Sequence, residues 1–67
     1  MFHERLKQAR LKNKLSQEDV AERLNIARSN ISKYENGNLE PNIKLLKDFC
    51  KIYNVSADYL LEIEETR

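Results

Sequence analysis

The chain has 67 residues, of which 40% are hydrophobic and 34% are charged, and its formal net charge is +1. A chain of this length builds one small core, so we expect residues 1–67 to form a single domain with one binding surface. The first ten residues are charged where a secretion signal would need an apolar stretch, which predicts a cytoplasmic protein with no membrane partner. A single cysteine excludes an internal disulfide.

Hydrophobic periodicity predicts an all-α domain of five helices. The first helix is expected over about residues 2–13. Ser16 is a good N-cap for the second helix, which is expected to end at Leu24. The third helix is predicted over residues 28–35 and stops at Gly37, which supplies a positive φ.

The fourth helix is expected to begin after Asn42 and to reach about Tyr53. Its inward-facing residues are predicted to be Ile43, Leu46, Phe49, Cys50 and Tyr53. Ser56 caps a short fifth helix through Leu61. Cys50 is expected to be a core residue because no His or second Cys accompanies it.

The second and third helices are separated by a very short break, which predicts a helix-turn-helix over about residues 17–36. Asn25 takes the bend because Asn tolerates the left-handed backbone conformation. Ala21 faces the crossing, where a larger side chain would push the two helices apart. If the second helix braces the third, four polar residues point outward: Arg28, Ser29, Ser32 and Lys33.

These outward side chains suit the major groove of double-stranded DNA. Arg28 is expected to contact guanine, because the bidentate contact of Arg with O6 and N7 is the commonest specific one. Lys33 lies one turn further on, where a flexible side chain reaches either a base or a phosphate. Ser32 is assigned to phosphate, and the hydroxyls of both Ser29 and Ser32 are expected to discriminate bases poorly.

Charge is distributed unevenly along the chain. Residues 1–14 contain five Lys or Arg and one Glu, whereas residues 48–67 contain two basic and five acidic residues. A basic half would orient the domain on phosphates. A surface rich in charge also serves solubility alone, so this pattern supports DNA binding only together with the motif.

The segments SQEDVAERL, ISKYENG and VSADYLL, with P-x-I-x-x-L before the last, resemble the XRE family, the phage-repressor and Cro type of helix-turn-helix. The resemblance covers residues 6–61. It implies a compact five-helix lambda-repressor-like domain that binds operator DNA as a homodimer, with helix 28–35 in the major groove.

The resemblance also implies roles for individual residues. The implied base contacts are Arg28, Ser29 and Lys33. The implied phosphate contacts are Gln17 and Asn36, to which we add Ser32. The implied structural salt bridge joins Arg10 to Glu35. Ala27 departs from the family, which often has Ser or Thr there, and a lost cap typically costs about 1 kcal/mol.

The dimer surface is expected within residues 53–67, because the family dimerises near there. The residues expected at this interface are Tyr59, Leu60 and Ile63. A two-fold dimer requires a near-palindromic operator with half-sites about 34 Å apart.

The sequence therefore predicts a sequence-specific transcriptional regulator, most simply a repressor. An interaction module, such as an antitoxin or a subunit of a larger regulator, is the alternative, and a protein antagonist or co-regulator remains an open partner. No enzyme, metal or cofactor is expected, because the sequence has no plausible catalytic pair, glycine-rich phosphate loop or ligand cluster.

Overall fold

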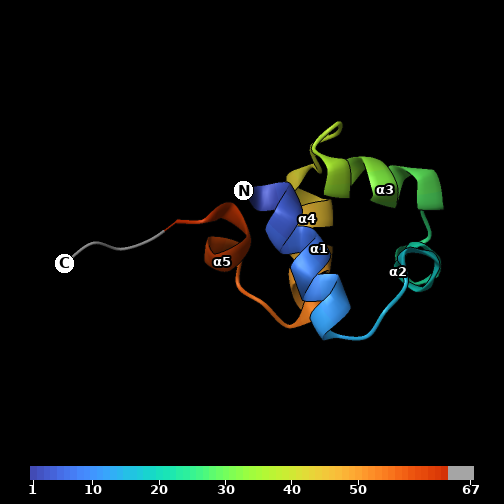
Figure 1. Cartoon of the computed structure of the whole chain (residues 1–67), viewed down its shortest axis with the longest axis horizontal. Coiled ribbons are helices and arrows are strands. Elements are labelled where there is room, and N and C mark those ends of the chain that lie inside the picture. The colour runs from blue at the N-terminus through green and yellow to red at the C-terminus, as the bar shows by residue number, and fades with distance from the viewer. Residues whose placement is uncertain (64–67) are drawn as a thin grey trace.

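The computed structural model describes residues 1–63 and contains five α-helices and no strand in that part of the chain (Figure 1). The helices are α1 (Phe2–Lys12), α2 (Gln17–Leu24), α3 (Arg28–Asn36), α4 (Ile43–Tyr53) and α5 (Ala57–Leu61). The predicted all-α, five-helix domain is thus confirmed, with each helix boundary within one residue of expectation. None of the helices described is long and apolar enough to cross a bilayer.

Local capping chemistry sets the helix ends. The Ser16 hydroxyl accepts a hydrogen bond from the Asp19 backbone N–H at 3.0 Å, as expected of an N-cap. Asn25 ends α2 in the left-handed conformation with φ of 55°, and Gly37 ends α3 with φ of 80°. Asn54 ends α4 in the same way, with φ of 54°. These ends follow from residue type alone.

The core lies where the five helices meet, and each of them contributes to it. The buried apolar side chains are Leu6, Ala9, Val20, Ala21, Ile31, Phe49, Tyr53 and Leu60. Phe49 is at its centre, stacked on Tyr53 with ring centroids 5.8 Å apart and edge-on to Tyr34 at 5.9 Å. Such ring pairs add to the stabilisation that burial of apolar area provides.

Ile43 was expected to face inward, and this prediction is wrong. Its side chain is 73% exposed, whereas Phe49 on the same helix is fully buried. Ile43 lies six positions before Phe49, which places it roughly 120° around an α-helix from the buried face. The first residue of α4 therefore points away from the core.

Candidate DNA interface

The α2–α3 unit has the geometry of a helix-turn-helix. Ala21 in α2 and Ile31 in α3 are both buried, with 6% and 1% exposure, where the two helices pack. The turn is closed by the Ile26 N–H, which donates to the Ala21 carbonyl at 3.0 Å. The small side chain at position 21 permits this close approach. As Figure 1 shows, α3 lies across one side of the domain, where its outer face is uncovered.

Five of the residues predicted to contact DNA share one surface hollow of about 370 Å³. Its lining consists of Gln17, Arg28, Ser29, Ser32 and Lys33. The first comes from the start of α2 and the others from α3, so the turn brings the two segments to one concave surface. The sixth residue, Asn36, is exposed at the last position of α3, where its Nδ2 donates to the Ser32 hydroxyl at 3.3 Å.

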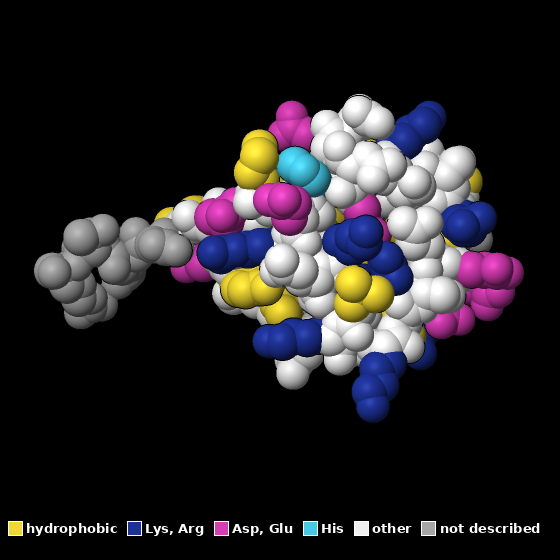
Figure 2. All heavy atoms as spheres, in the orientation of Figure 1, with side chains coloured by type: hydrophobic (Ala, Val, Ile, Leu, Met, Phe, Trp, Pro, Cys, Tyr) yellow, Lys and Arg dark blue, Asp and Glu magenta, His cyan; other side chains and the backbone are white. Residues whose placement is uncertain are grey.

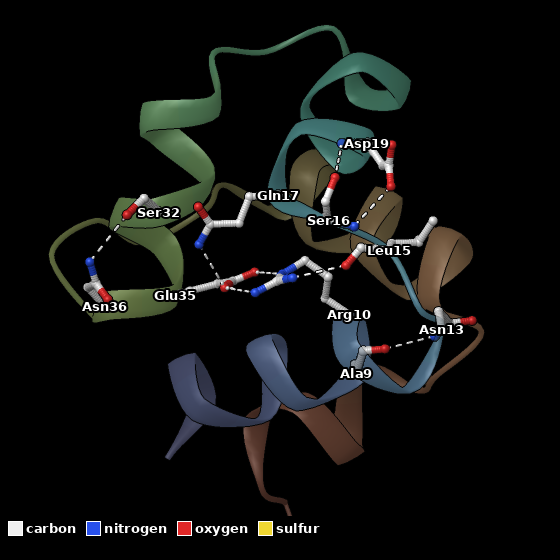
Figure 3. Close-up of polar contacts among 10 residues, drawn as sticks. All are labelled: Ala9, Arg10, Asn13, Leu15, Ser16, Gln17, Asp19, Ser32, Glu35 and Asn36. Atoms are coloured by element: carbon white, nitrogen blue, oxygen red, sulfur yellow. Dashed lines mark hydrogen bonds and ion pairs between the residues drawn. The ribbon is translucent and has the colours of Figure 1, made fainter.

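A buried hydrogen-bonded network supports this surface from behind (Figure 3). Arg10 donates through Nε to Glu35 Oε2 at 2.7 Å and through Nη2 to Oε1 at 3.0 Å, which forms the implied salt bridge. Gln17 Nε2 donates to Glu35 Oε1 at 3.2 Å. The network thus links α1, α2 and α3, and its Gln17 member reaches the hollow.

The positive charge of Arg10 is compensated by acceptors within the network. The hydrogen bond from Arg10 to Glu35 raises the pKa of the guanidinium above its ordinary value. Arg10 also donates through Nη1 to the Leu15 carbonyl at 2.9 Å, so its charge is compensated on two sides. A buried charge pair keeps its place only when its hydrogen bonds are satisfied in this way.

The N-terminus of α3 lacks a side-chain cap, as expected from Ala27 at a position where the family often has Ser or Thr. The helix begins at Arg28 with Ala27 as its N-cap, and no side chain hydrogen bond caps it. The first-turn N–H groups at this end therefore find no side-chain acceptor at residue 27, although the Asn30 N–H donates to the Ala27 carbonyl at 3.0 Å, whereas the Ser16 hydroxyl caps α2.

The predicted dimer residues are not equally available to a partner. Leu60 is 0% exposed within the core of its own chain, so its assignment to an interface is wrong. Leu60 lies on the face of α5 that packs on α1. Tyr59 is half-buried beneath Arg5, whose guanidinium carbon is 4.9 Å from the ring centre. Ile63 is 56% exposed, and residues 64–67 of the expected interface lie outside the described residues.

A second concave surface, which the sequence did not predict, runs along α4 to the start of α5. It has a volume of about 430 Å³. Its lining consists of Ile43, Leu46, Lys47, Cys50, Lys51, Val55, Ser56 and Ala57. We call it the α4 groove. Cys50 packs partly against the core and partly lines this groove, and burial raises the pKa of its thiol.

Comparison with known proteins identifies the class. A helix-turn-helix family model matches residues 6–60, so this chain belongs to the XRE-type helix-turn-helix family of DNA-binding domains. It is 44% identical over 64 residues to the HTH-type transcriptional activator BcrR of Enterococcus faecalis, covering 96% of this chain and 31% of BcrR.

Two relatives from Bacillus subtilis (strain 168) are equally similar. The HTH-type transcriptional regulator ImmR is 44% identical over 61 residues, which are 91% of this chain and 48% of ImmR. The uncharacterized HTH-type transcriptional regulator YqaE is 44% identical over 64 residues, 96% of this chain and 55% of YqaE. This chain thus spans 31% to 55% of the length of these relatives.

Proposed function

We propose that this chain binds double-stranded DNA in a sequence-specific manner, with α3 in the major groove, and regulates transcription. The observation that carries the proposal is the single hollow formed by α3 and the start of α2, lined by one Arg, one Lys and three uncharged polar residues. Side chains of these types match the acceptors and mixed partners that base edges and phosphates present. The regulator names of the relatives support the same function. We place this activity in the cytoplasm.

Within this interface, α3 reads the bases. Arg28 is exposed in the first turn of α3, and we assign it a bidentate contact with guanine. Ser29 and Lys33 follow on the same outer face and complete the base-reading set.

The phosphate contacts flank the base-reading residues. Gln17 is the first residue of α2, where the helix dipole also favours an anion. Its Nε2 is held by Glu35, which fixes the side chain beside the hollow before DNA arrives. Ser32 and Asn36, joined by their own hydrogen bond, supply the other two phosphate contacts.

We propose that the protein acts as a homodimer on a near-palindromic site with half-sites about 34 Å apart. The α4 groove, which runs from Ile43 along α4 to Ala57, supports a dimer surface on this side, and we expect the exposed Ile63 and the half-buried Tyr59 to take part. Its floor is apolar, and a second copy of the chain would remove that area from water.

Repression by occupation of a promoter is the simplest action for such a domain, and it is the action we propose. The names of the relatives do not decide its direction, since BcrR is named an activator. A reporter gene under the selected site, measured with and without the protein, decides between repression and activation.

Selection of bound sites from a randomised duplex library, at moderate salt and with the 67-residue chain, tests the proposal. We expect an inverted repeat with guanine at fixed positions. The same selection with folded Arg28→Ala protein should lose preference at those guanines. If folded wild-type protein enriches no motif, sequence-specific binding by this chain is refuted.

A further inference from the structure

His3 lies at the end of the α3 surface, although nothing in the sequence connects it with α3. It belongs to the first turn of α1, and its side chain is half-buried. Its imidazole atoms are 3.1 to 3.4 Å from the position that a Cβ on Gly37 would take. The ring therefore packs on the backbone at the C-terminal end of α3, where the absence of a side chain at residue 37 leaves room for it.

The same ring is accessible from outside. His3 lines a surface hollow of about 220 Å³ together with Tyr34, Gly37, Leu39 and Glu40. Figure 2 shows the histidine side chain at the surface with acidic side chains near it. Gly37 directly follows Asn36, to which we assigned a phosphate contact. The imidazole therefore packs on the residue next to an assigned phosphate contact.

The charged groups around His3 are mostly acidic. Glu40 lines the same hollow, Glu4 is the next residue of α1, and Glu62 follows α5, where the Met1 ammonium, Arg5 and His3 lower the pKa of its carboxyl. The Met1 ammonium is close as well, but it is engaged by Glu62 at 2.8 Å and by Glu4 at 3.2 Å. Arg5 Nε is also 3.7 Å from Glu62 Oε1, so Glu4 and Glu62 are partly compensated, and a protonated imidazole would add a positive charge beside Glu40. The C-terminal end of a helix also favours a cation.

We propose that His3 is a further contact to the DNA backbone and that its protonation strengthens binding to the operator. This inference rests on the proposed function. It couples DNA affinity to pH through the charge of the imidazole.

Other groups do not account for such a coupling. His3 is the only histidine of the chain. The carboxylates of Glu62 and Glu4 raise the pKa of the Met1 ammonium, and burial raises the pKa of the Cys50 thiol, so both shifts move proton release toward higher pH.

The test is the affinity of the full chain for the selected operator between about pH 5.5 and pH 8, at two or more salt concentrations. Wild-type protein should bind roughly two- to fivefold more tightly at the acidic end, the size expected of an exposed ion pair. The slope of log affinity against log salt should steepen by about 0.9 there, as for one added phosphate contact.

Three variants make the test specific. His3→Gln should bind at all pH values as wild type does at about pH 8. His3→Lys carries a permanent charge and should remove the pH dependence while retaining the steeper salt slope. His3→Gln combined with Gln8→His moves the histidine elsewhere on α1 and should not restore the dependence.

The outcomes separate this inference from the proposed function. Tight operator binding with a flat pH profile, or a pH dependence that survives in folded His3→Gln protein, overturns the role of His3 and leaves the proposed function intact. Absence of specific DNA binding at every pH overturns both.

Discussion

Arg10 and Glu35 form a bidentate ion pair across the α1–α3 contact, with nitrogen-to-oxygen distances of 2.7 and 3.0 Å. Their side chains are only 8% and 2% exposed. The pair joins residues 25 positions apart and also binds Gln17, so the position of α3 and one end of the candidate interface depend on it.

Removal of one partner of this pair should destabilise the fold strongly. Glu35→Ala leaves the Arg10 guanidinium buried without its carboxylate, and we expect a loss of about 3 to 5 kcal/mol in the free energy of unfolding. Chemical denaturation measures the loss. Glu40→Ala, at an exposed site, is the matched control and should be close to wild type. Wild-type stability in Glu35→Ala would contradict a structural role for the pair.

Acid should weaken the start of α2. The backbone N–H and the hydroxyl of Ser16 lower the pKa of the Asp19 carboxyl. A carboxylate with a lowered pKa contributes stability above its unfolded value of about 3.9, and this contribution is lost as the pH falls through the lower folded value. Asp19→Asn should therefore unfold more easily than wild type at neutral pH, and the difference should vanish in strong acid.

Thermal unfolding of both proteins at neutral and acidic pH measures this effect. The neighbouring Glu18→Gln is the control. Glu18 is exposed, and the Ser16 N–H donates to the carboxylate of Asp19 and not to that of Glu18. An Asp19→Asn difference that persists unchanged in strong acid would exclude the linkage.

Tyr53 should tolerate loss of its hydroxyl. The side chain is buried, and its Oη has no hydrogen-bond partner within residues 1–63. An unpaired buried hydroxyl carries a desolvation cost, so we expect Tyr53→Phe to be neutral or to raise the free energy of unfolding by up to about 1 kcal/mol. Urea denaturation measures the free energy of unfolding of Tyr53→Phe, and Tyr34→Phe is the control. A clear loss in Tyr53→Phe alone would mean that this hydroxyl is satisfied in solution.

Arg28 should determine base preference without affecting the fold. The side chain is exposed, so Arg28→Ala should unfold as wild type does. Its loss should remove about 1 to 3 kcal/mol of discrimination at the guanine position. Competition between the selected operator and single-base variants measures this. Arg23→Ala on α2 is also exposed and should retain the discrimination.

The α4 groove should determine the oligomeric state. Ile43 is 73% exposed and lines the groove, so Ile43→Ser should weaken the dimer and leave the fold unaffected. Leu11 on α1 is 55% exposed, and Leu11→Ser is a control of the same kind at another site. Sedimentation equilibrium over a range of concentrations compares the two. An Ile43→Ser dimer as tight as wild type would place the interface elsewhere.

The local sequence determined the helices and their ends. Ser16, Asn25 and Gly37 set helix boundaries through bonds and φ values that involve only neighbouring residues, which is why these features were predictable. The outer face of α3 was equally predictable, because the helical period fixes which side chains stand opposite Ile31.

Tertiary structure decided what depends on residues far apart in the chain. Leu60 and Ile43 are both apolar residues on predicted helices, yet one is buried and the other is 73% exposed. The approach of His3 to Gly37 joins positions 34 residues apart and has no periodic signal in the sequence. Local physics fixes the direction of a side chain around its helix, whereas burial depends on which other helices pack against that face.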